Sequence, residues 1–203
     1  MYSINDIKKI SLLRHSGDQQ KLSILQLTPD FIDAFSVYFS QLLLGEMKKQ
    51  KTEMSFLNFW KLSWDLDVPN NKKVISSHYL SVTVTRGITT RFTDSNEKIT
   101  TELLDYFATT VSNGKQHIEL IKAITEMAKN DDLINPKLRK GNNVAFLFRE
   151  TFKSILVAVF ENKKEVIIPG IGSFKRGHRV KKKNETKSIR SGVLQMTPTP
   201  NLK

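Results

Sequence analysis

Two segments of this chain are predicted to form long helices that are apolar around most of their circumference. The first runs from Thr28 to about Lys49 and the second from about Val144 to Glu161. A surface helix buries one stripe of side chains, whereas an arc this wide must be covered on two sides. A small three-stranded sheet covers one side only, so we expect each helix to be covered also by the other half of the chain. The apolar residues are Phe31, Ile32, Phe35, Tyr38, Phe39, Leu42 and Leu43 in the first segment, and Phe146, Leu147, Phe148, Phe152, Ile155, Leu156, Val159 and Phe160 in the second.

The segments around the first long helix predict one more helix and three strands. Ile4, Ile7 and Ile10 have helical spacing within residues 3–14, and a polar loop is expected to follow. Thr28 is the expected N-cap of the long helix, with Pro29 as its first residue. "MSFLNFWKLSWDL" and "HYLSVTVT" are rich in aromatic or β-branched residues, which favours strands, and "VPNNKK" is typical of a turn.

The second half repeats this order of elements. "HIELIKAITEMAKN" predicts a helix with Ile118, Ile121 and Ile124 near one face. "EVIIPGIGSFKRG" predicts a strand, a turn through Gly170 and Gly172 and another strand, and "GVLQMTPTPNLK" predicts a closing strand. The repeated order predicts an α+β fold of two modules, residues 1–92 and 117–203, joined by a connecting helix within residues 93–116.

The excess of positive charge lies almost entirely in the second half. The formal net charge is +12, of which residues 1–114 hold +1 and residues 115–203 hold +11. Cations at high density repel one another unless they are solvated or matched by a polyanion. We therefore expect residues 175–190 to bind a polyanion, and a solvated loop is the open alternative. The candidate contacts are Lys175, Arg176, Arg179, Lys181, Lys182, Lys183, Lys187 and Arg190, while Lys137, Arg139 and Lys140 either extend this patch or cap a loop.

The sequence argues against several classes of function. It has no cysteine, which rules out disulfides, thiolate zinc sites and cysteine nucleophiles. Its four histidines are scattered, and it has no HExxH or P-loop pattern and no complete dinucleotide-binding fingerprint around "GIG". We therefore expect no catalytic residues, metal, cofactor or small-molecule substrate. No apolar run is long enough to span a membrane and the start lacks a signal-peptide core, so we expect an intracellular protein without membrane contact.

Residues 117–203 resemble the HU/IHF family of small basic DNA-binding proteins. The resemblance rests on "ELIKAITEMA" as first helix, on "FRETFKSILVAVFENKKEVIIPGIGSF" as second helix, first strand and glycine turn before a Phe, and on "MTPTPNLK" as the end of the closing strand. It implies two helices and a three-stranded antiparallel sheet per module, with the two modules intertwined as a pseudo-dimer within one chain. Gly170 and Gly172 would be structural turn residues. The expected interface between the modules comprises Phe35, Phe39, Phe146, Phe148 and Phe152.

Residues 1–92 resemble the family only in outline. In "FLNFWKLSW", Trp60 stands where the family has a glycine. We expect Trp60 and Trp64 in the core, with Trp60 as an anchor for a partner in the alternative case. The tandem layout, together with "VPNNKKVISSHYLSVTV", resembles a eukaryotic family of coiled-coil-domain-containing proteins, the eighty-one type, which is associated with centrosomes and cilia.

The segment between Phe174 and Thr197 takes the place of the DNA-gripping arm of HU-like proteins. In such proteins an arm-tip proline wedges between base pairs and bends the DNA, but this segment contains neither proline nor an aromatic residue. The resemblance and the charge together predict one basic arm that binds without intercalation, independently of sequence and with strong salt dependence. The favoured partner is the acidic surface of tubulin in a ciliary or doublet microtubule, among neighbouring structural proteins. The alternative is double-stranded DNA, bound by an architectural protein of a nucleus or nucleoid.

Overall fold

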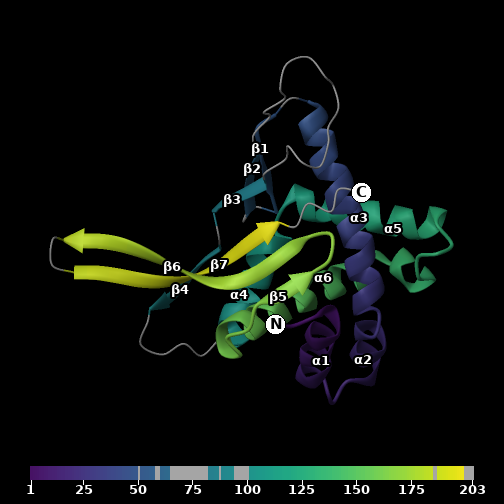
Figure 1. Cartoon of the computed structure of the whole chain (residues 1–203). Coiled ribbons are helices and arrows are strands. Elements are labelled where there is room, and N and C mark those ends of the chain that lie inside the picture. Colours follow the sequence, from purple (N-terminus) through teal and green to yellow (C-terminus); the bar gives the residue numbers. More distant parts are fainter. Residues whose placement is uncertain are drawn as a thin grey trace.

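The computed structural model shows an α+β fold of helices and two antiparallel sheets (Figure 1). It describes residues 1–49, 51–57, 60–64, 82–86, 88–93, 101–184 and 187–198. The turn predicted at "VPNNKK", residues 58, 59, 65 and 66 of the predicted strand segment "MSFLNFWKLSWDL", residues 78–81 of "HYLSVTVT" and the tail after Pro198 lie outside these residues. The α+β class predicted from the sequence is confirmed, and the assignment to tandem HU/IHF-like modules stays a prediction.

Both predicted long helices are present. In the first half the elements are α1 (Ile4–Arg14), α2 (Gln19–Leu25), α3 (Thr28–Lys48), β1 (Glu53–Phe56), β2 (Trp60–Trp64), β3 (Val82–Arg86) and β4 (Ile88–Thr93). In the second half they are α4 (Thr101–Ser112), α5 (Lys115–Asn130), the 3-10 turn η1 (Pro136–Arg139), α6 (Gly141–Leu156), the π-helical turn η2 (Val157–Glu161), β5 (Val166–Ile168), β6 (Gly172–Asn184) and β7 (Lys187–Pro198).

The short helix α2 replaces the predicted polar loop. Asp18 caps this helix, because its side chain accepts a hydrogen bond from the Lys21 N–H at 3.0 Å. The prediction of Thr28 as N-cap of α3 is also wrong. Its hydroxyl donates to the Leu25 carbonyl at 2.7 Å inside a buried junction, so α2 runs almost directly into α3.

The strands form two sheets, and consecutive strands β3 and β4 belong to different sheets. The first sheet has the order β1-β2-β3, and the second has the order β4-β7-β6-β5. β4 was not predicted, and it pairs with β7 so that Ile88 lies opposite Leu194. The chain therefore leaves the first sheet at Arg86 and enters the second at Ile88. A strand from the first half thus supports the base of β7.

The helices of the two halves bury matching positions. Most positions buried in the helices of the first half have a buried counterpart 113 residues later, from α1 and α5 through to the ends of the long helices, and Leu27, Thr28 and Ile32 are the exceptions. Because one separation holds for all of these pairs, the spacing between matching buried positions is the same in the two halves. The pairs are Ile7 and Leu120, Ser11 and Ile124, Leu25 and Leu138, Phe31 and Val144, Ala34 and Leu147, Phe35 and Phe148, Phe39 and Phe152, Leu43 and Leu156, and Met47 and Phe160.

The sheets repeat with a separation of 112 residues. Leu62 lies opposite Val84 in the first sheet, and Phe174 lies opposite Met196 in the second. The same separation places Trp60 at the position of Gly172, since Phe56 pairs with Trp60 as Ile168 pairs with Gly172. The strands after the long helices therefore pair in the same register in both halves. Among the described residues between β1 and β2, Leu57 has a left-handed backbone conformation, with φ of 52°.

The long helices of the two halves pack against each other through aromatic rings. The ring centroid of Phe35 on α3 lies 6.2 Å from that of Phe148 and 6.2 Å from that of Phe152, both on α6. All three side chains are at most 3% exposed. This contact covers a second side of each wide apolar arc, as expected from the sequence.

The buried face of α5 differs from the predicted one. Its buried residues are His117, Leu120, Ile124 and Ala128, whereas Ile118 is 53% exposed. The prediction placed the buried face on the isoleucines. The face that packs against α6 instead includes His117, whose ring contacts that of Phe148.

Candidate polyanion-binding site

The basic segment forms a two-stranded ribbon that projects from the body of the protein. β6 and β7 pair along most of their length and extend beyond the end of β4, as Figure 1 shows at the left. Near the body the ribbon is wider, because β5 pairs with β6 as far as Phe174 and β4 pairs with β7 as far as Ser191. Beyond Ser191, the described strands of the ribbon are β6 and β7 alone.

All eight predicted contact residues lie on this ribbon. Near the body, Lys175 is exposed and Arg176 is half-buried. Beyond Gly177 the cations are placed by strand register, and Lys183 falls at an irregularity in the pairing near the tip. The pairs that contain a cation are Lys175 and Gln195, Arg176 and Leu194, Arg179 and Ser191, Arg190 and Val180, Lys181 and Ile189, Lys182 and Ser188, and Lys187 and Asn184.

The cations occupy positions on both faces of the ribbon, because successive residues of a strand alternate between faces. Arg179 and Lys181 occupy positions of one face, which we call the outer face. Lys182 and Arg190 occupy positions of the opposite face, the inner face, because Arg190 lies opposite Val180. Beyond the body, each face thus holds two regularly paired cationic positions.

The root of the ribbon fixes these two faces relative to the helices. Phe174, Leu194 and Met196 belong to the inner face and are at most 3% exposed, so this face continues from the packed core. Lys175 belongs to the outer face and is exposed already at the root. The inner face is therefore available to a partner only farther out along the ribbon.

The turn between β5 and β6 is held by α3. Gly170 has φ of +76°, and a Cβ at this position would overlap the hydroxyl oxygen of Ser36. That hydroxyl donates a hydrogen bond to the Pro169 carbonyl at 3.3 Å. A glycine is required here both by the backbone conformation and by the close approach of the helix. The contact supports the structural role predicted for Gly170, which lies in the β5–β6 turn where that turn meets α3 of the first half.

The free edge of β5 is closed by the N-terminal residues. Tyr2 forms a parallel bridge with Val166, in which its N–H donates to the Glu165 carbonyl at 2.7 Å and its carbonyl accepts from the Ile167 N–H at 3.0 Å. First-half residues therefore hold the second sheet at three places: the β5 edge, the β5–β6 turn and, through β4, the edge of β7.

The second half makes a similar contact with the first sheet. The side-chain amide of Gln116 on α5 accepts from the Leu57 N–H at 2.6 Å and donates to the Ser55 carbonyl at 3.0 Å. This amide takes the place of a peptide group along the β1 edge. Sequence patterns did not indicate Tyr2, Ser36 or Gln116, because each acts through one or two hydrogen bonds that form only in the folded protein.

A cluster of charged side chains joins α1, α4 and α6. Glu150 is 5% exposed, and its carboxylate lies 2.9 Å from Nε2 of His15, 3.5 Å from the Arg14 guanidinium and 3.3 Å from Nζ of Lys153. Lys153 also lies 2.7 Å from the carboxylate of Asp105 on α4. Burial alone would raise the pKa of Glu150. The hydrogen bond from His15 and the nearby cations together lower this pKa by more than burial raises it, so the net shift is downward from 4.5. The carboxylate is therefore charged, and the cluster holds the halves together.

His117 is a further titratable side chain whose pKa is shifted by burial. It is 4% exposed, its ring centroid lies 5.0 Å from that of Phe148, and its Nδ1 has no hydrogen-bond partner within the described part of the chain. Burial, aided by the charge of Arg149, lowers the pKa of His117 below its ordinary 6.5. Among the described residues no group of acidic, histidine or cysteine side chains could hold a metal ion. Nor is any helix of the described residues long and apolar enough to cross a membrane.

The basic loop before α6 lies away from the ribbon. Nε of Arg139 donates to the Ala128 carbonyl at 2.8 Å, which closes the end of α5, and this end lies on the side of the molecule opposite the ribbon tip (Figure 1). The sequence left open whether Lys137, Arg139 and Lys140 extend the basic patch or cap a loop. The hydrogen bond of Arg139 corresponds to a loop cap. Lys140 instead borders a hollow between α2 and α6.

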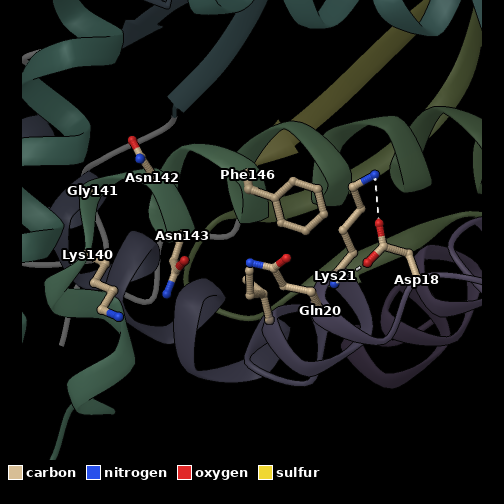
Figure 2. A pocket seen from close by; sticks show the side chains of 9 residues that line it. Asp18, Gln20, Lys21, Lys140, Gly141, Asn142, Asn143 and Phe146 are labelled. Carbon is tan, nitrogen blue, oxygen red and sulfur yellow. Dashed lines mark hydrogen bonds and ion pairs between the residues drawn. The ribbon is translucent and has the colours of Figure 1, made fainter.

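That hollow, of about 720 Å³, is shown in Figure 2. Phe146 and Ile24 contribute apolar surface, and Lys21 and Lys140 stand at its rim. The Lys21 ammonium is paired with the Asp18 carboxylate at 3.0 Å. We assign no chemistry to it.

The predicted interface phenylalanines take different positions. Phe35, Phe148 and Phe152 meet directly between α3 and α6. Phe39 stacks on Phe35 within α3, and Phe146 is only partly buried. The Phe146 ring contacts another element of the first half, since it lies 5.7 Å from the ring of His15. Gly172 begins β6, and Trp60 and Trp64 begin and end β2, with side chains outside the described part.

No protein-family model matches this chain, and comparisons with curated proteins and with solved structures give no significant match.

Proposed function

We propose that this protein binds double-stranded DNA through the β6–β7 ribbon, without sequence preference and without catalysis. The observation that carries the proposal is the projecting ribbon, where eight cations are opposed by Glu185 alone. Phosphate contacts from such residues supply affinity without reading sequence. A two-stranded ribbon is also one of the shapes that fit a groove of duplex DNA.

The proposal includes the finer fold assignment. Two HU/IHF-like modules, residues 1–92 and 117–203, form a pseudo-dimer within the chain. Support comes from the burial pattern that recurs after 113 residues and the strand register that recurs after 112. Further support comes from reciprocal contacts, because Ser36 holds the turn of the second sheet and Gln116 holds the edge of the first. In this assignment the second module supplies the basic arm.

Docking on the acidic surface of tubulin is the alternative, and it uses the same cations. In the sequence, the one-sided charge favoured tubulin. The projecting ribbon instead favours duplex DNA, because a ribbon can fit a groove of the duplex and a flat lattice has no such groove. Nuclear or nucleoid localisation accompanies DNA binding, and cytoskeletal localisation accompanies tubulin binding.

Two binding measurements on the full chain separate these functions. Fluorescence anisotropy with a random-sequence DNA duplex and cosedimentation with microtubules are run in parallel at about physiological salt. The proposal expects saturable DNA binding whose affinity falls steeply as salt is raised. Microtubule pelleting without DNA binding would establish the tubulin alternative, and failure of both assays would reject the ribbon as a polyanion-binding site.

A further inference from the structure

We infer that Ser188 is a phosphorylation site and that a phosphate on this residue releases the ribbon from DNA. This inference rests on the proposed function and adds a covalent switch to the same site. The modifying group is a phosphate ester, and the enzyme that attaches it is a serine kinase that recognises basic sequences.

The first argument is the position of Ser188 on the ribbon. It lies opposite Lys182 in the pairing of β6 and β7, so both occupy the inner face. Arg190 follows on β7 after one intervening residue and therefore belongs to the same face. Residues directly opposite in an antiparallel pair have Cβ atoms about 5 Å apart, and alternate residues of one strand are about 7 Å apart. The positions of two proposed DNA-binding cations thus lie within reach of a group attached to Ser188.

The second argument is the charge of a phosphate ester. At neutral pH it carries about −1.5 to −2 charges and three acceptor oxygens. It forms charge-assisted hydrogen bonds with Lys and Arg side chains, which are the bonds that DNA phosphates form with them. Because a phosphate on Ser188 belongs to the same chain, it competes with DNA at an effective concentration of about millimolar. Such a phosphate would occupy Lys182 and Arg190 and repel the DNA backbone from the neighbouring cations.

The third argument is access for a kinase. Ser188 lies between Ser191 and the tip, where the described strands of the ribbon are β6 and β7 alone, and Figure 1 shows this part projecting from the body. A two-stranded hairpin is marginally stable in water, so this segment opens locally and can enter a kinase as an extended peptide. Ser191 is held more firmly, because it pairs with Arg179 on one side and with Thr93 of β4 on the other. Ser188 is therefore the more accessible serine of β7.

The residues around Ser188 have the charge pattern that a kinase with an acidic substrate cleft recognises. Lys187 precedes the serine, Arg190 follows it closely, and three lysines at 181–183 lie upstream. In the transfer from ATP, the Ser188 hydroxyl oxygen bonds to the γ-phosphorus, and the bond from this phosphorus to the oxygen of the β-phosphate breaks. ADP leaves, and the hydroxyl proton passes to the catalytic carboxylate of the kinase.

Phosphorylation of the full chain tests the site. The protein is incubated with ATP and the catalytic domain of protein kinase C, which accepts serines flanked by basic residues. The phosphate is then located by fragmentation mass spectrometry. We expect phosphate at Ser188 in preference to Ser191, both in the wild type and in the Ser191→Ala variant. A wild-type chain without phosphate at Ser188 would overturn the inference.

Phosphoserine incorporated at Ser188 during translation tests the effect on DNA binding. Loss of two phosphate contacts makes the slope of log affinity against log salt less negative by about 2, which corresponds to about 30-fold weaker binding at about 0.15 M salt. We expect this loss for a random-sequence DNA duplex, with unchanged thermal unfolding. Phosphoserine at Ser23, an exposed residue of α2 away from the ribbon (Figure 1), is the control of equal charge. It should change the affinity by less than about threefold, because salt screens distant charges.

Removing the paired cations tests how the phosphate acts. In Lys182→Gln with Arg190→Gln, a phosphate on Ser188 has neither of its two partners. It should therefore weaken DNA binding of this variant by about fivefold or less, well below the effect in the wild type. Equal losses in the two backgrounds would overturn the pairing. Ser188→Ala without phosphate should bind DNA as the wild type does, because the serine itself is not among the binding residues.

The outcomes separate this inference from the function on which it rests. If the unmodified chain binds DNA but phosphate at Ser188 weakens binding no more than phosphate at Ser23 does, the switch is wrong and DNA binding stands. If the unmodified chain binds no DNA duplex, the proposed function fails and the switch fails with it.

Discussion

Replacing Gly170 by alanine tests the contact through which the first half holds the root of the ribbon. In the wild type this residue has φ of +76° and lies against Ser36 of α3. Alanine would have to adopt a left-handed conformation and would also place its Cβ onto the Ser36 hydroxyl. Both effects destabilise the folded state.

The expected loss combines two contributions. A left-handed backbone conformation costs a non-glycine residue about 1–2 kcal/mol. Displacing the Ser36 hydroxyl breaks its 3.3 Å hydrogen bond to the Pro169 carbonyl, which costs about 0.5–1.5 kcal/mol. With some strain from the shifted side chain, Gly170→Ala should reduce the free energy of unfolding by about 2–4 kcal/mol. For a protein of this size the midpoint of thermal unfolding should fall by roughly 5–15 °C.

Urea unfolding of Gly170→Ala, Ser36→Ala and the double variant separates the two contributions. Ser36→Ala removes the hydroxyl that the new Cβ would meet, so the double variant should be about 1 kcal/mol more stable than the sum of the single effects predicts. Gly45→Ala is the matched control, because this helical glycine has no atom within 4 Å of an added Cβ, and it should stabilise the protein by about 0.5–1 kcal/mol. A Gly170→Ala variant as stable as the wild type, or strictly additive effects, would refute the clamp.

Three other substitutions test two contacts between the halves and the buried histidine of the second half. Gln116→Glu keeps the acceptor for the Leu57 N–H but loses the donor to the Ser55 carbonyl, so it should reduce the free energy of urea unfolding by about 1–2 kcal/mol, more than a Gln→Glu change at exposed Gln20. Glu150→Gln should cost about 1–3 kcal/mol at pH 7. Because the pKa of Glu150 lies below 4.5, the wild-type advantage should persist above that pH and disappear as the pH falls through the lowered pKa; a constant difference would contradict this reasoning. The folded pKa of His117 is depressed below 6.5, so wild-type stability should decline as the pH falls below 6.5, and His117→Gln should remove that part of the decline.

The elements that the sequence predicts well are those with strong periodicity or turn chemistry. The wide apolar arcs identified α3 and α6 and the need for cover from both halves, which the contact between Phe35 and Phe148 provides. The glycine turn and the alternating residues around it identified β5, β6 and β7. The repeated order of elements was also visible, although only the burial pattern shows how closely the helical positions correspond.

The elements that were missed depend on local or tertiary contacts. α2 has seven residues, too few for a clear period, and it forms through the Asp18 cap and its junction with α3. "ITTRFT" in β4 has β-branched residues, but nothing local shows that it pairs with β7, more than 90 residues away in the chain. Tertiary packing likewise chose His117 rather than Ile118 for the buried face of α5.

The cations of the candidate site could be predicted from the charge of the sequence, but their arrangement on the ribbon could not. The run of cations identified Lys181 and its neighbours, but charge alone gives neither the pairing with β7 nor the division of the cations between two faces. Those features follow from the register of β6 and β7, in which buried Phe174 lies opposite buried Met196.

The central claim is that the ribbon cations bind duplex DNA, and the most direct test is the triple variant Lys181→Glu, Lys182→Glu, Lys183→Glu. Its affinity for a random-sequence DNA duplex is measured beside that of the wild type between about 50 and 200 mM salt. We predict a wild-type slope of log affinity against log salt of about −4 or steeper, corresponding to at least four phosphate contacts, and loss of binding by the variant with unchanged thermal unfolding. A variant that binds DNA as tightly as the wild type would contradict the account.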